Sequence, residues 1–160
     1  MSIHVRRATQ ADGTTLLALV RKLADYEKLD PPAPDAEQRL LRDAFGSEPR
    51  IQVLIVELEG TAVGYAIFFE TYSSFLARPT LYLEDLFVVT EARGAGAGGA
   101  VMRWLAREAI RRGCGRFEWQ VLDWNEPAIG FYQHLGARHV EGWQTYRLTG
   151  AELQRLADGS

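Results

Sequence analysis

The sequence predicts an α/β domain, more closely an α+β domain, in which a mixed, mostly antiparallel sheet is flanked by helices. Short runs that alternate apolar and polar residues indicate strands, and longer runs with apolar residues every three or four positions indicate helices. Their order along the chain is β-α-α-β-β-β-α-β-α-β. The chain has 160 residues, of which 47% are hydrophobic, so we expect one domain, residues 1–160, with a sizeable core.

The first strand is expected at residues 3–7, where apolar and polar side chains alternate. Thr9 and Asp12 have the spacing of a capping box and are expected to open a helix, whose apolar stripe runs from Leu16 to Ala24. The prolines of "LDPPAPDAE" end that helix, and Asp35 is expected to cap a second one.

Three strands are predicted next, at residues 51–58, 61–70 and 81–89. Glu59-Gly60 between the first two is typical of a hairpin turn. The third strand carries Glu84 and Asp85 in an otherwise apolar run. Because neighbours on a strand point to opposite faces, we expect at most one of these two acids to face a given pocket.

The second half begins with a run of glycine and alanine, followed by a long helix with an apolar face from Val101 to Ile110. A strand is expected at residues 116–122 and a short helix within residues 125–137, with Pro127 in its first turn and Gly136 at its C-terminal cap. The segment "WQTYRLT", residues 143–149, is predicted to be the last strand.

The glycine-rich loop "ARGAGAGG" fits two phosphate-binding patterns. Gly94, Gly96 and Gly99 have the G-x-G-x-x-G spacing of dinucleotide-binding loops, and Arg93 with Gly96 and Gly98 reads as R-x-x-G-x-G, a loop that can hold the pyrophosphate of coenzyme A. Both patterns use small residues to bring backbone N–H groups close to phosphate at a helix N-terminus. The dinucleotide pattern conflicts with its context, because hairpins precede the loop and too few residues follow for a doubly wound sheet. A Walker A loop is excluded, since no Gly-Lys-Ser/Thr follows.

Charge and composition exclude several other classes. The net charge of −3 and the lack of a basic run argue against nucleic acid as a partner. One cysteine and three scattered histidines predict neither a disulfide nor a metal site. The N-terminus lacks the apolar region of a signal peptide and no apolar run approaches about 18 residues, so we expect a cytoplasmic protein without a membrane partner.

Three segments, "LYLEDLFV", "ARGAGAG" and "WNEPAIGFYQHLGA", resemble in order and spacing the GCN5-related N-acetyltransferase (GNAT) superfamily, and within it the diamine (spermidine/spermine) acetyltransferases. The resemblance runs from about Val5 to Leu148. It implies the GNAT fold, acetyl-CoA as the acetyl donor, and a homodimer. The residues it implies for donor binding are Leu86, Phe87, Val88, Arg93, Gly94, Ala95, Gly96, Ala97, Gly98, Gly99, Asn125, Pro127 and Ala128.

The resemblance also implies the catalytic residues. Tyr132 matches the tyrosine that protonates the departing thiolate of coenzyme A, although the same ring could simply be part of a helical core stripe. Glu84 matches the carboxylate that accepts the proton of the amine, and its alternative is an acid paired with a nearby arginine. An amine with a pKa near 10 must lose its proton before it attacks, so an anion beside it suits this chemistry.

Tyr26 and Glu27 match the family's substrate-side pair, and Glu84, Glu118 and Glu141 lie at or near positions that line the same pocket. We therefore expect transfer of the acetyl group to a small polycationic amine by direct attack in a ternary complex. The loop "TYSSFLARP" and Glu118 depart from the diamine acetyltransferases, so thialysine, another small amine or a protein amine stays open as the acceptor. An acyl-CoA-binding regulator without turnover is the alternative from a different class.

Overall fold

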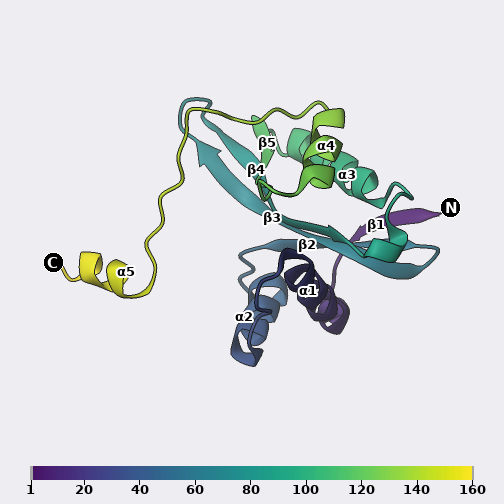
Figure 1. Cartoon of the computed structure of the whole chain (residues 1–160), viewed down its shortest axis with the longest axis horizontal. Helices are drawn as coiled ribbons and strands as arrows, with labels where there is room; N and C mark the ends of the chain where they lie inside the picture. Colours follow the sequence, from purple (N-terminus) through teal and green to yellow (C-terminus); the bar gives the residue numbers. More distant parts are fainter. Residues whose placement is uncertain (1, 160) are drawn as a thin grey trace. The chain divides into compact units, whose positions relative to one another are not determined.

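A five-stranded sheet with the strand order β1-β2-β3-β4-β5 is the centre of the first of two units (Figure 1). The computed structural model describes residues 2–159, which divide into one unit up to Gln120 and a second from Val121 onward. The first four strands pair antiparallel, and β5 pairs parallel with β4. The strands are β1 Ile3–Arg7, β2 Gln52–Leu58, β3 Thr61–Ser73, β4 Arg78–Val88 and β5 Arg116–Trp119.

Helices cover both faces of this sheet, as its alternating side chains require. On one face, Leu16 and Leu19 of α1 pack against Tyr65 and Ile67 of β3. On the other face, Trp104 of α3 meets the ring of Phe68 at 5.9 Å between centroids. The helical segments of this unit are η1 Gln10–Asp12, α1 Gly13–Glu27, α2 Pro34–Phe45, η2 Thr90–Ala92 and α3 Ala97–Arg111.

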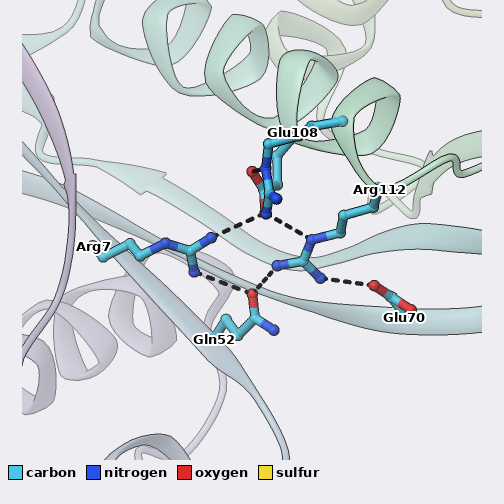
Figure 2. A network of polar contacts seen from close by, with 6 residues as sticks. Arg7, Gln52, Glu70, Glu108 and Arg112 are labelled. Atoms are coloured by element: carbon cyan, nitrogen blue, oxygen red, sulfur yellow. Dashed lines mark hydrogen bonds and ion pairs between the residues drawn. The ribbon is translucent and has the colours of Figure 1, made fainter.

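Polar contacts around Glu108 hold the C-terminal end of α3 against the sheet (Figure 2). The Glu108 carboxylate, whose side chain is 7% exposed, forms ion pairs with Arg7 of β1 at 3.0 Å and with Arg112 at 2.7 Å. Arg112 also pairs with Glu70 of β3 at 2.9 Å and donates to the side chain of Gln52 of β2. Three strands are thus tied to the end of the helix that begins at the glycine loop.

The second unit contains α4 Glu126–His134 and α5 Gly150–Ala157. The strand predicted at residues 143–149 is absent from the described chain, so this prediction was wrong. The side chains of Trp143 and Tyr146 are 83% and 88% exposed there. Strand-forming residues supply only a preference, and a strand also needs a partner for its backbone groups.

Several local predictions were correct. The backbone N–H of Thr9 donates to the Asp12 carboxylate at 2.7 Å, which confirms the capping box. Glu59 and Gly60 have positive φ values of 51° and 81°, as in the hairpin turns that match the twist of strands.

The prediction that Asp35 caps α2 was wrong. The helix begins one residue earlier, at Pro34, whose fixed φ suits the first helical position. Within residues 2–159, no helix is long and apolar enough to cross a membrane.

Candidate active site

The glycine loop leads directly into the N-terminus of α3. Gly94 and Gly96 have φ values of 85° and 90°, a backbone conformation that residues other than glycine rarely adopt. Gly96 is the residue before the first helical turn, and no side chain caps the helix there. The first N–H groups of a helix lack partners within the helix and attract anions. The loop therefore fits the phosphate-binding role predicted for residues 93–99.

Strand β4 changes its pairing partner along its length. β5 pairs with residues 80–83 of β4 and ends at Trp119. From Asp85 to Val88, β4 is paired with β3 alone within the first unit. Parting strands leave backbone groups on one side of Leu86, Phe87 and Val88, the three residues predicted to contact the donor, without a partner in the sheet. Those backbone groups suit an extended ligand that adds to the strand edge.

A β-bulge places Glu84 and Asp85. Ile67 of β3 pairs with Asp85 and Phe68 pairs with Leu83, so Glu84 is the extra residue on β4. The bulge interrupts the alternation on which we based the expectation that the two acids face opposite ways. Glu84 is exposed, and Asp85 is partly buried and accepts a hydrogen bond of 2.9 Å from the hydroxyl of Tyr65. Tyr65 was not among the predicted site residues.

Two carboxylates, those of Glu27 and Glu84, influence the ionisation of a third, that of Asp85. Burial raises the pKa of Asp85 to about 6, and Glu84 and Glu27 contribute to the rise, whereas the hydrogen bond from Tyr65 opposes it. Burial also raises the pKa of Glu27, at the end of α1. The predicted substrate-binding acids Glu27 and Glu84 therefore lie close enough to the same group to affect its ionisation.

Arg93 connects the glycine loop with the predicted substrate side. Its guanidinium lies 4.6 Å from the centre of the Tyr26 ring and 5.8 Å from that of Phe87. Its Nε donates to the backbone carbonyl of Val88 at 3.0 Å. The two motifs at residues 25–28 and 93–99 are thus neighbours in the fold, which their separation in the sequence did not reveal.

Glu118 lies on β5, opposite Tyr82 of β4 in the strand register. Its side chain is 44% exposed and forms a long ion pair of 3.8 Å with Arg116. Burial, Glu84 and Glu118 together raise the pKa of the Tyr82 phenol, so Glu118 belongs to the same acidic region of the sheet as Glu84.

The remaining predicted residues lie in the second unit. The Asn125 side chain caps α4 by accepting from the backbone N–H of Ala128 at 3.4 Å, and Pro127 is in the first turn, as predicted. Tyr132 lies on α4, and burial raises the pKa of its phenol, which keeps the proton that a general acid must donate. Glu141 is exposed and lies outside the helices. The functional roles of these residues stay predictions. Among residues 2–159, no group of three or more His, Cys, Asp or Glu side chains is arranged to hold a metal ion.

Comparison with known proteins agrees with the fold. A family model described as "Acetyltransferase (GNAT) family" matches residues 17–137. The thialysine N-epsilon-acetyltransferase of Sus scrofa is 36% identical over 167 residues, covering 98% of each chain. The human spermidine/spermine N(1)-acetyltransferase-like protein 1 is 31% identical over 96% of this chain but only 24% of that protein.

A solved structure gives the same result at the level of the fold. An integron cassette protein from the mobile metagenome of V. cholerae superimposes with a TM-score of 0.82 at 28% identity, covering 98% of both chains. Because the family model matches well over half of the chain, this protein belongs to the acetyltransferase (GNAT) family.

Proposed function

We propose that this protein transfers the acetyl group of acetyl-CoA to the amino group of a small amine, and that its two units together form one acetyltransferase domain. The observation that carries the proposal is the glycine loop at the uncapped N-terminus of α3, beside the stretch of β4 that pairs on one side only. The match of the family model to residues 17–137, across both units, supports a single domain.

The donor's pyrophosphate would be held by backbone N–H groups of residues 94–99, helped by the dipole of α3. The pantetheine arm would lie along Leu86, Phe87 and Val88, where one side of β4 has no partner strand in the first unit and suits an extended chain. Asn125, Pro127 and Ala128, at the start of α4, would supply further donor contacts.

The chemistry requires proton transfers at both the attacking nitrogen and the departing sulfur. Glu84 accepts the proton of the substrate ammonium through water, and the free amine then attacks the acetyl carbonyl carbon. A backbone N–H of β4 stabilises the negative charge on the carbonyl oxygen. The C–S bond breaks, Tyr132 gives its proton to the departing sulfur, and the second proton lost from the nitrogen of the new amide restores the Tyr132 hydroxyl. The products are the acetamide, the free thiol and one proton released to solvent once both residues regain their starting states.

Two acceptor classes are supported by different observations. Thialysine acetyltransferases are among the relatives that are similar over the full length, which favours a small amine of that kind. The carboxylates of Glu27, Glu84 and Asp85 favour a polycation such as spermidine, because each anion near a positive charge stabilises it. We place thialysine-like amines first and polyamines second.

We also propose a homodimer. Several large apolar side chains of the second unit are exposed in the single chain: Val140, Trp143, Tyr146 and Leu148. Large apolar side chains exposed within one segment of nine residues favour an interface with a second copy of the chain. Sedimentation equilibrium of the purified protein should give twice the mass of the chain, and a monomer at micromolar concentration would contradict the proposal.

A thiol-release assay tests the activity directly. Purified protein with acetyl-CoA should release free coenzyme A when thialysine, lysine, ornithine, putrescine, spermidine or spermine is added singly, and mass spectrometry should find the amine heavier by one acetyl group. A protein that binds acetyl-CoA in a calorimetric titration but acetylates none of these amines, nor a peptide amine, would instead be a regulator that binds the donor.

A further inference from the structure

Fully buried Tyr65 and partly buried Asp85 form a polar pair in an otherwise apolar layer between the sheet and α1. The Tyr65 side chain is fully buried, and its ring lies 6.5 Å from that of Phe87. Its hydroxyl donates to Asp85 Oδ2 at 2.9 Å. A carboxylate that is partly withdrawn from water costs free energy unless something compensates for it.

The groups that face Asp85 are mostly anionic. They are Tyr65 from β3, Glu84 from its own strand and Glu27 from α1. Among the described residues, no lysine or arginine forms an ion pair with Asp85, Glu84 or Glu27. The protein thus gathers three carboxylates at the bulge of β4 without supplying a cation for them, and Tyr65 is the neutral donor that favours the ionised form of Asp85.

We propose that Tyr65 is a positioning residue for the acceptor amine. Its hydroxyl orients Asp85 as a third anionic group, beside Glu27 and Glu84, that binds the ammonium group of the acceptor. The inference rests on the function proposed above. It adds two residues to the site. Tyr65 lies on β3, outside the three segments that resemble the family, and Asp85 was not among the predicted site residues.

A purely structural role for the pair has different consequences. If Asp85 only satisfies the buried hydroxyl of Tyr65, removal of that hydroxyl changes stability and leaves the pH dependence of catalysis as it was. If Asp85 binds the amine, removal of the hydroxyl raises the pKa of Asp85, and the carboxylate is then ionised only at higher pH.

The test compares Tyr65→Phe, Asp85→Asn and the double variant. The Phe substitution keeps the ring and its packing. We expect Tyr65→Phe to move the acidic limb of kcat/KM for the amine upward by about one pH unit, so that activity on the acidic side falls about tenfold. Activity should approach that of the wild type at high pH. In the Asp85→Asn background the same change should have no further effect on the limb.

Controls separate positioning from folding. Tyr146→Phe removes a hydroxyl from an exposed side chain outside the proposed amine-binding groups and should leave the profile unchanged. The affinity for acetyl-CoA should be the same in all four variants, measured by calorimetric titration. An acidic limb unmoved in Tyr65→Phe, or moved equally in the Asp85→Asn background, overturns the inference. Failure of the proposed function looks different, since the wild type then acetylates no amine, and the inference falls with it.

Discussion

The guanidinium of Arg93 lies over the ring of Tyr26, 4.6 Å from its centre. This contact joins the glycine loop to the last turn of α1, two segments to which the proposal gives different ligands. The Nε of Arg93 is fixed by the carbonyl of Val88, so the planar group is held from two sides. A change at the amine side can therefore reach the loop that would hold acetyl-CoA.

The first prediction concerns this contact. Tyr26→Leu removes the aromatic face and should weaken acetyl-CoA binding by about twofold to tenfold, because a cation–π contact at a partly exposed site contributes about 0.5–1 kcal/mol or somewhat more. Tyr26→Phe keeps the face and should bind like the wild type. Calorimetric titration of both variants measures the difference. Equal affinity in Tyr26→Leu would mean that the ring does not position Arg93.

The second prediction tests the N-terminus of α3. Gly96 has a positive φ, so a larger residue there would strain the backbone as well as block a ligand. Gly99 lacks a positive φ, and a Cβ on it would meet only the flexible end of Arg103 at 3.3 Å. Gly99→Ala should therefore keep or raise thermal stability, since alanine favours helix, while acetyl-CoA affinity falls at least severalfold.

A matched variant is available in α4. Gly130 is also helical, and a Cβ there meets nothing within 4 Å. Gly130→Ala should raise thermal stability in the same way and leave the affinity for acetyl-CoA unchanged. If both variants bind acetyl-CoA like the wild type, the first turn of α3 does not hold the pyrophosphate.

Much of the fold could be predicted from local patterns, because each strand and helix is marked by its own residues. The hairpin at Glu59-Gly60 and the capping box of Thr9 and Asp12 depend on chemistry within a few positions, and both predictions were correct. The strand at residues 143–149 was wrong because pairing depends on a distant partner, which alternation alone does not provide.

The candidate site was only partly visible in the sequence for the same reason. Arg93 and Tyr26 are 67 positions apart, and Tyr65 and Asp85 meet only because β3 and β4 pair with a bulge at Glu84. A bulge inserts one residue without a clear signal in the residues themselves. The alternation of strand residues therefore suggested that Glu84 and Asp85 face opposite ways. The bulge that interrupts this alternation is found only in the register of β3 and β4.

The third prediction concerns the proton donor. Tyr132→Phe should lower kcat by about 10²- to 10⁴-fold with little change in thermal stability or acetyl-CoA affinity, because only the hydroxyl is lost. Tyr146→Phe, at a side chain 88% exposed in the same unit, is the matched control and should keep full activity. Single-turnover kinetics show whether chemistry limits the rate. With chemistry limiting, a decrease of less than a few-fold in Tyr132→Phe would leave Tyr132 with a packing role.

The fourth prediction concerns stability and the contacts in Figure 2. Hydrogen bonds from Arg111 and Arg112 lower the pKa of Glu108 from 4.5 to about 2. The ionised carboxylate therefore stabilises the fold above about pH 4.5, and this contribution is lost as the pH falls toward 2. Glu108→Gln should lower the unfolding free energy at pH 7 by about 1–2 kcal/mol, less than the full shift implies, because solvent screens the exposed Arg111.

Denaturant unfolding of Glu108→Gln at several pH values measures that difference, which should shrink below pH 4.5. Asp35→Asn removes an acid from the exposed ion pair with Arg39 and serves as the control, with little expected change. A difference between wild type and Glu108→Gln that stays constant down to pH 2 would show that the loss is one of packing.

The last prediction separates a carboxylate that binds the amine from one that removes its proton. Burial raises the pKa of Glu27, so its ionised form is disfavoured in the folded protein and the unfolding free energy falls as the pH rises through that range. Glu27→Gln is nearly isosteric and should not destabilise the protein at pH 7. Without the charge, we expect a higher KM for a cationic amine and a much smaller change in kcat.

Glu84→Gln should behave in the opposite way. Glu84 is the extra, exposed residue of the β4 bulge, so its replacement disturbs little packing. If it accepts the amine's proton, the variant should have a lower kcat and a pH profile moved upward, because more of the amine must then lose its proton to solvent before it attacks. Steady-state kinetics from pH 6 to 10, with the same amine for both variants, measure this contrast. Unchanged amine kinetics in both variants, or a wild type that prefers a neutral or anionic acceptor, would exclude these carboxylates from the acceptor site even if acetyl transfer itself is observed.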